Sequence, residues 1–280
     1  MFVKILKNPI VAAPILAYLI LLVPTLYLYS GSPPETKVEV YRGAWFPTVL
    51  PSAMAEMKDM GMNTIFFMGD PGAITTAIVQ TAHRNGLKVA LTIGRPQGDF
   101  DLEVLNSNII ELAKLAEKYG VEFFAPMNEP DSIFEEDTER WAQEILPRIR
   151  EVYHGEVIWK GADIRDDDLS GYDYLGFSIC PVGDMTPEDY SQHFDSVLNQ
   201  ALAVAKRYNL KGVMVTEFGT WAWESWLGEP ERSEEDIARA HEVVLERGKD
   251  KAVGFFYLDR FPGVSSKARE AVSRWYKEIL

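Results

Sequence analysis

Glu129 and Glu217 are the two residues whose type and position best suit bond-breaking chemistry. Each follows a short apolar run, Phe123–Met127 before Asn128-Glu129 and Val213–Thr216 before Glu217. A glutamate at such a place is costly unless it is paired or used. Hydrolysis of a glycosidic bond needs two carboxyl groups beside one bond, one protonated and one ionised. We therefore predict that this pair cleaves glycosidic bonds; the alternative is that both glutamates only begin solvated loops.

Other reactive side chains give less support for a different chemistry. None of the histidines falls at the end of a predicted strand, and we expect all of them to be surface residues: His83, His154, His193 and His241. Histidine-based nucleophilic catalysis and histidine-bound metal are therefore disfavoured. The single cysteine, Cys180, is expected to be a small buried residue. The acidic run 166–168 suits a solvated loop better than a Ca²⁺ site, and we expect no metal and no cofactor.

The chain alternates short β-branched and aromatic runs with longer amphipathic stretches. Strands are predicted at Val38–Pro47, Asn63–Asp70, Lys88–Arg95, Val121–Asn128, Glu156–Gly161, Tyr174–Cys180, Gly212–Glu217 and Ala252–Leu258. Helices are predicted at Pro51–Met60, Gly72–Asn85, Asp101–Tyr119, Thr138–Val152, Pro187–Tyr208, Ser233–Arg247 and Ser265–Ile279. The stretch 164–170 is too degenerate for a helix.

Eight strands that each return through a crossover predict an α/β fold with a parallel sheet covered on both faces. Eight such units close into a (β/α)₈ TIM barrel, whose active site lies at the carboxyl ends of the strands. An open doubly wound sheet is the alternative, but the turn Trp45–Thr48 has no glycine-rich phosphate loop. In the barrel, Glu129 follows the fourth strand and Glu217 ends the seventh. Facing each other across the mouth, they could reach the roughly 5–5.5 Å separation of a retaining enzyme.

Further side chains near the same strand ends are expected to bind the substrate. They are Trp45, Arg95, Asn128, Asp131, Asp163, Trp221, Trp223 and Tyr257. The tryptophans offer flat apolar faces on which sugar rings stack, although a self-packed loop would use them equally well. The charged residues also suit solvated loop ends.

Two motifs together resemble clan A of the glycoside hydrolases. They are Asn128–Pro130 at the fourth strand and Thr216–Gly219 at the seventh. The resemblance implies that Glu129 is the acid/base and Glu217 the nucleophile. It also implies that Asn128 hydrogen-bonds the substrate 2-hydroxyl.

Within that clan, the compact length, Trp45 and Gly176–Ser178 are loosely similar to family 113 mannanases. Family 5 enzymes commonly have a histidine on the third strand and a tryptophan on the eighth. This chain has Arg95 and Tyr257 near those places.

Charge and the N-terminal segment suggest where the barrel works. The 280 residues carry a net charge of −14, which disfavours nucleic acid as a partner. Lys4 and Lys7 precede the charge-free run 9–29, which is long enough to span a bilayer. We expect 1–30 to be a transmembrane anchor, 31–37 a linker, and 38–280 an extracellular barrel that acts on an oligo- or polysaccharide. A cleaved signal peptide, which would release the barrel, is the alternative.

The residues leave three other activities open. A transglycosylase of cell-surface glycan would use the same two glutamates. A carbohydrate-binding barrel without activity would keep the cleft, whereas a surface scaffold would need none.

Overall fold

The computed structural model describes residues 39–45, 51–219, 232–258 and 266–280. Within them, eight strands form a closed barrel in chain order, and every adjacent pair is parallel. The strands are β1 (Tyr41–Trp45), β2 (Thr64–Met68), β3 (Lys88–Thr92), β4 (Phe123–Ala125), β5 (Glu156–Gly161), β6 (Tyr174–Ile179), β7 (Gly212–Phe218) and β8 (Gly254–Leu258). The predicted TIM barrel is confirmed.

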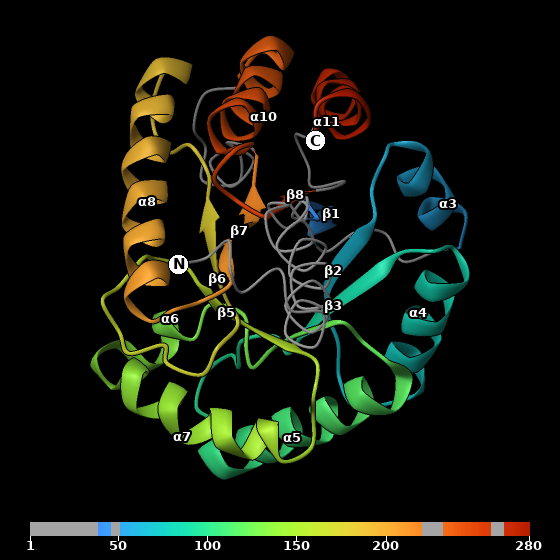
Figure 1. Cartoon of the computed structure of the whole chain (residues 1–280), viewed down its shortest axis with the longest axis vertical. Helices are drawn as coiled ribbons and strands as arrows, with labels where there is room; N and C mark the ends of the chain where they lie inside the picture. The colour runs from blue at the N-terminus through green and yellow to red at the C-terminus, as the bar shows by residue number, and fades with distance from the viewer. Residues whose placement is uncertain (1–38, 46–50, 220–231, 259–265) are drawn as a thin grey trace, which may run out of the picture. The chain divides into compact units, whose positions relative to one another are not determined.

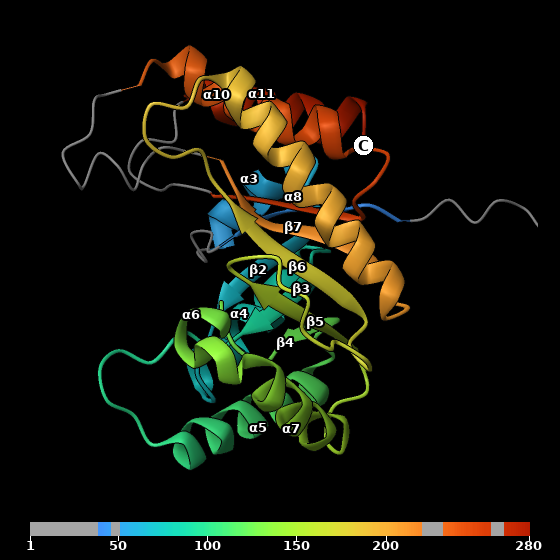
Figure 2. The ribbon, with the colours of Figure 1, turned by 90° about the vertical axis from the view of Figure 1, so that its left-hand side faces the viewer.

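Helices surround the barrel, as Figures 1 and 2 show. They are α3 (Pro51–Asp59), α4 (Ala73–Arg84), α5 (Leu102–Tyr119), α6 (Asp131–Phe134), η1 (Glu135–Asp137), α7 (Thr138–Arg150), α8 (Pro187–Arg207), α10 (Glu234–Gly248) and α11 (Ser266–Glu278). The short α6 and η1 were not predicted. As expected, 162–173 contains no helix, so β5 runs to β6 through irregular chain.

Local sequence sets several helix boundaries. The Asp101 carboxylate accepts hydrogen bonds from the backbone N–H groups of Glu103 and Val104, and so caps the start of α5. Gly120 ends that helix in the left-handed conformation, with φ 67°. Thr186 and Asp189 form a reciprocal capping box at the start of α8.

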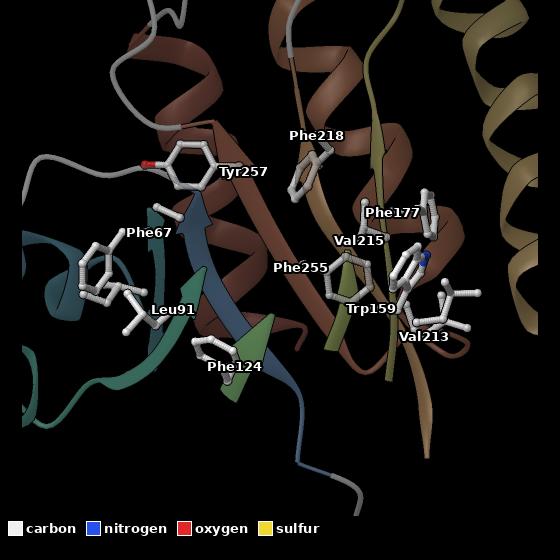
Figure 3. Packing of buried hydrophobic residues seen from close by; sticks show 14 of the residues in the cluster. Phe67, Leu91, Phe124, Trp159, Phe177, Val213, Val215, Phe218, Phe255 and Tyr257 are labelled. Carbon is white, nitrogen blue, oxygen red and sulfur yellow. The ribbon is translucent and has the colours of Figure 1, made fainter. Parts of the chain in front are cut away.

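Alternation along each strand separates two apolar layers. One set of side chains packs outside the barrel wall, beneath the helices; Figure 3 shows Phe124, Trp159, Phe177 and Tyr257 among them. The other set fills the barrel interior, where the Phe66 ring contacts those of Trp45 and Phe256. The polar side chains of the cavity described below gather at the carboxyl ends of the strands, above this inner layer.

Residues Val40–Leu280 form one compact unit, separate from the chain that precedes it. The predicted anchor 1–30 and linker 31–37 lie outside the described residues. No helix within the described part of the chain is long and apolar enough to cross a membrane.

Candidate active site

A cavity of about 530 Å³ lies at the carboxyl ends of the strands. It is lined by Trp45, Met68, Arg95, Asn128, Glu129, Ser178, Ile179, Cys180, Val182 and Glu217. The structure thus brings both predicted glutamates to one hollow, together with three of the predicted substrate residues. Among the described residues, no group of three His, Cys, Asp or Glu side chains is arranged to hold a metal ion.

Glu129 is held just beyond β4 by the neighbouring strands. Its backbone N–H donates to the Lys160 carbonyl at 3.0 Å, and the Asn128 N–H donates to the Ile93 carbonyl at 3.0 Å. Glu129 also has a positive φ of 52°, which is unfavourable for a residue with a Cβ and costs of order 1–3 kcal/mol. The surrounding hydrogen bonds maintain this conformation at the residue that carries the carboxylate.

Glu217 is directed into the cavity by a β-bulge. On β6 and β7, Phe177 lies opposite Val215, but the next residue, Ser178, lies opposite Glu217. β7 therefore contains one extra residue at this point. Its pairing with β8 shifts in the same interval. A bulge reverses the alternation of side chains. Thr216 and Glu217 consequently both face inward, and Phe218 packs outside the wall.

The two carboxylates meet at one buried lysine. The Lys160 Nζ lies 3.4 Å from Glu217 Oε2 and 3.8 Å from Glu129 Oε1. Since both distances start at the same nitrogen, these two oxygens lie no more than about 7 Å apart. That limit admits the spacing of roughly 5–5.5 Å found in retaining enzymes and excludes most of the wider range of inverting ones. A surface scaffold, which would need no cleft, does not account for a cavity that holds these two carboxylates.

Both oxygens of Glu129 have partners in this arrangement. The Ser178 hydroxyl donates to Oε1 at 2.7 Å. The Arg95 Nη1 lies 3.1 Å from Oε2, and the Arg95 side chain is 43% exposed. A proton donor at Glu129 needs one of these oxygens, so Arg95 and the proton compete for Oε2.

Burial raises the pKa of the Glu217 carboxyl, and the nearby Glu129 adds to this. The Lys160 ammonium acts in the opposite direction and lowers that pKa. Burial prevails, because Glu217 is almost completely withdrawn from water.

Asn128 and Trp45 lie where the sequence predicted them. The Asn128 Oδ1 is buried and has no hydrogen-bond partner within the described chain, so it can accept from a sugar hydroxyl. The Trp45 ring faces the cavity, and the Lys160 Nζ lies 4.2 Å from the ring centre.

Three predicted substrate residues lie elsewhere. Asp131 is buried, and its carboxylate accepts hydrogen bonds from the backbone N–H groups of Ala162 and Asp163. It therefore fixes the chain after β5. Tyr257 packs outside the barrel wall, with its hydroxyl 4.0 Å from Met60 Sδ. The expectation that Asp131 and Tyr257 bind the substrate was therefore wrong.

Asp163 is exposed and lines a second hollow of about 400 Å³ rather than the cavity. This hollow lies beside α8, next to the irregular segment that joins β5 to β6, and also borders His193. It shares Ser178 and Cys180 with the cavity. Cys180 is half-buried rather than buried. Trp221 and Trp223 lie outside the described residues.

His241 contradicts the expectation of a surface histidine, because its side chain on α10 is completely buried. Its Nδ1 lies 2.8 Å from the Ile237 carbonyl and must donate to it. A Cβ at Gly219 would lie 2.4 Å from its Nε2, and Gly219 has a φ of 147°. Burial lowers the pKa of His241 to about 4, so the imidazole is neutral at pH 7.

Lys160 and Ser178 are the residues of the site that sequence reasoning missed or left unassigned. The sequence pattern identifies Lys160 only as one residue of the strand Glu156–Gly161. Its neighbours Val157 and Trp159 pack outside the wall and Ile158 packs inside. By alternation, a lysine two residues after Ile158 must point into the barrel mouth, which is the signal that could have found it.

No protein-family model and no curated protein matches the chain. Solved structures do resemble it. A GH113 β-mannanase from Alicyclobacillus acidocaldarius has a TM-score of 0.62 and 16% identity, covering 86% of this chain and 98% of that one. Thermotoga maritima Cel5A has a TM-score of 0.63 and 13% identity, covering 86% and 100%. A β-glucuronidase from an uncultured Clostridium has 0.67 and 18%, covering 85% and 50%.

The chain shares the barrel fold of these enzymes. At such identities the likeness shows the fold alone. The expected likeness to clan A glycoside hydrolases is confirmed for the fold, because the structures that resemble this chain include GH113 mannanases and Cel5A.

Proposed function

We propose that this protein is a retaining glycoside hydrolase that cleaves β-linked glycans with Glu129 and Glu217. The observation that carries the proposal is the carboxylate pair: two glutamates at the ends of β4 and β7 line one cavity and contact the same lysine. The spacing of no more than about 7 Å admits the separation found in retaining enzymes and lies below most of the range over which inverting enzymes hold a water between their carboxyl groups.

The reaction has two steps. In the first, Glu217 attacks the anomeric carbon, the glycosidic bond breaks, and Glu129 gives its proton to the departing oxygen. In the second, water attacks the same carbon and gives a proton to Glu129, and the ester bond to Glu217 breaks. Asn128 is placed to hold a hydroxyl of the sugar, and Trp45 provides a flat wall. An acceptor sugar in place of water would give transglycosylation with the same residues.

The electrostatics favour a second assignment, in which the roles are exchanged. Burial raises the pKa of Glu217, which suits an acid, while Glu129 has a cation at one oxygen and a donor at the other. We retain Glu217 as the nucleophile, because the motif resemblance assigns it that role and Lys160 opposes the effect of burial.

A screen of aryl β-glycosides and β-linked polysaccharides, with product configuration followed by NMR, tests the proposal. We expect retained configuration, with activity lost in Glu129→Gln and Glu217→Gln. Glu111→Gln, at an exposed glutamate that pairs with Lys114, is the matched control. Inverted product would refute the retaining mechanism. Activity equal to wild type in both glutamine variants would refute the assignment of catalysis to this pair. A wild type that binds the polysaccharides but cleaves none of them would leave a carbohydrate-binding barrel.

Azide then separates the two role assignments. Azide replaces the missing nucleophile or attacks the glycosyl-enzyme when the acid/base is missing, so the two cases give opposite anomers of the glycosyl azide. A β-azide from Glu129→Ala and an α-azide from Glu217→Ala support our assignment, and the reverse pair would support the exchange.

The substrates in the screen are chosen by analogy with enzymes that share the fold. These enzymes include a β-1,4-mannanase, a Cel5A solved with mannotriose and a β-glucuronidase. We propose β-linked hexose polymers, with β-mannan, β-glucan and β-glucuronide as separate arms.

We also propose that residues 1–30 anchor the barrel at the outer face of a membrane. The charge-free run 9–29 after Lys4 and Lys7 supports this. Digestion of intact cells with an external protease should remove the barrel. A barrel in the culture medium that lacks residues 1–30 would support cleavage instead.

A further inference from the structure

Lys160 is completely buried and lies at the centre of the site. Its Nζ donates to Ser178 Oγ at 3.1 Å and contacts Glu217 Oε2 at 3.4 Å and Glu129 Oε1 at 3.8 Å. An ammonium has three N–H donors, and three oxygens surround this one. The fourth side is covered by the Trp45 ring, 4.2 Å away, which attracts a cation through its π face.

A buried cation is stable only if a negative charge accompanies it. If the proposed function holds, the carboxylate pair supplies one negative charge before each chemical step. Before the first, Glu217 is ionised and Glu129 holds the proton. After it, Glu217 is a neutral ester and Glu129, having given up the proton, is ionised. The charge has moved from one glutamate to the other.

We propose that Lys160 is a positioning residue that compensates this charge in both steps, pairing with Glu217 before attack and with Glu129 in the glycosyl-enzyme. The inference rests on the proposed function. Its geometric basis is that one nitrogen lies within 4 Å of both carboxylates, so the charge can change place without any movement of the backbone. A fixed charge of this kind needs little reorganisation during the reaction.

Other charged groups near the site are less able to do this. Arg95, after β3, contacts Glu129 and is 43% exposed, so water screens its charge. Ser178, on β6, is neutral. The charged groups that face Lys160 are therefore Glu129 from the end of β4 and Glu217 from β7, with Arg95 beyond Glu129. Lys160 is the buried cation of this set, and its field is screened least.

Two substitutions at Lys160 separate its charge from its shape. Lys160→Met keeps the length and the apolar contact with Trp45. Lys160→Gln keeps a hydrogen-bond donor and removes the charge. The matched control is Lys88→Met. Lys88 begins β3, so it lies at the opposite end of the barrel, and it also lies over an aromatic ring, 5.1 Å from the centre of Tyr41.

The rates of the two steps are measured separately, from the burst and the steady state with a 2,4-dinitrophenyl glycoside of the sugar that the wild type cleaves. We expect each Lys160 variant to lose roughly 10²- to 10³-fold in both steps, the size of effect known for removal of one fixed electrostatic group. We also expect the acid limb of kcat/KM to move to higher pH. Lys160 lowers the pKa of Glu217, so without it Glu217 ionises at a higher pH.

Each outcome decides the inference. Lys160→Gln with the rates and pH profile of the wild type would overturn it, because the charge would then be dispensable. A loss confined to the first step would overturn the claim that Lys160 serves both glutamates. A thermal melt establishes that the variants fold, and an unshifted acid limb in a folded but slow variant would show a merely structural role. If the wild type cleaves no glycoside, the proposed function itself has failed.

Discussion

Buried His241 predicts a specific loss of stability in acid. Burial lowers its pKa from 6.5 to about 4 in the folded protein, whereas in the unfolded chain it takes up a proton near pH 6.5. Neutral His241 therefore lowers the free energy of unfolding by nothing above pH 6.5. As the pH falls from 6.5 towards 4, the unfolded chain gains a proton that the folded protein does not take up, so the free energy of unfolding decreases. At 1.36 kcal/mol per pH unit, the complete loss is roughly 3 kcal/mol, of which about 2 kcal/mol appears between pH 7.0 and 4.5.

His241→Met removes the titration and keeps an adaptable apolar side chain beside Phe218 and Tyr257. Urea unfolding of the full chain at pH 7.0 and 4.5 measures the effect. Other groups also titrate in this range, so the informative quantity is the difference between wild type and variant. Wild type should lose about 2 kcal/mol more than His241→Met on acidification. The exposed His193→Met is the control and should follow the wild type. Equal losses in wild type and His241→Met would refute the reasoning.

Two further substitutions test the corrected assignments. Asp131→Asn leaves the backbone N–H groups after β5 with one acceptor oxygen instead of two, and should lower the free energy of unfolding by about 1–3 kcal/mol; unfolding in urea measures this, and unchanged stability would mean that the segment does not depend on the carboxylate. Tyr257→Phe should leave KM for the glycoside unchanged, because the side chain packs outside the barrel wall. A raised KM with normal stability would show that the hydroxyl reaches the sugar after all.

The architecture could be predicted because each unit carries its own local signal. Short apolar runs, amphipathic stretches and turn glycines recur in a regular order, and β5 was predicted with the observed bounds. Strand ends then restricted the chemistry to a few positions, which is why Glu129, Glu217, Asn128 and Trp45 were found. The missing helix between β5 and β6 was visible for the same reason.

The failures concern the direction in which a side chain points and partners distant in sequence. Tyr257 is one residue away from Phe256 and Leu258, which face the interior, so a shift of one position placed it on the wrong face. Asp131 binds a segment about thirty residues later, and no local pattern reveals that contact. The bulge that turns Glu217 inward leaves no clear mark in the sequence. Lys160 could have been found by alternation, but its two carboxylate partners could not.

The left-handed backbone at Glu129 creates a conflict between stability and activity. A glycine would adopt this φ without steric cost but would remove the carboxylate. Selection or design for stability alone would therefore act against the residue on which the chemistry depends. The backbone hydrogen bonds from Asn128 to Ile93 and from Glu129 to Lys160 must therefore stabilise a conformation that a glutamate disfavours. Substitutions in β3 and β5 that preserve folding can thus still reduce turnover, through the conformation of a residue that they do not replace.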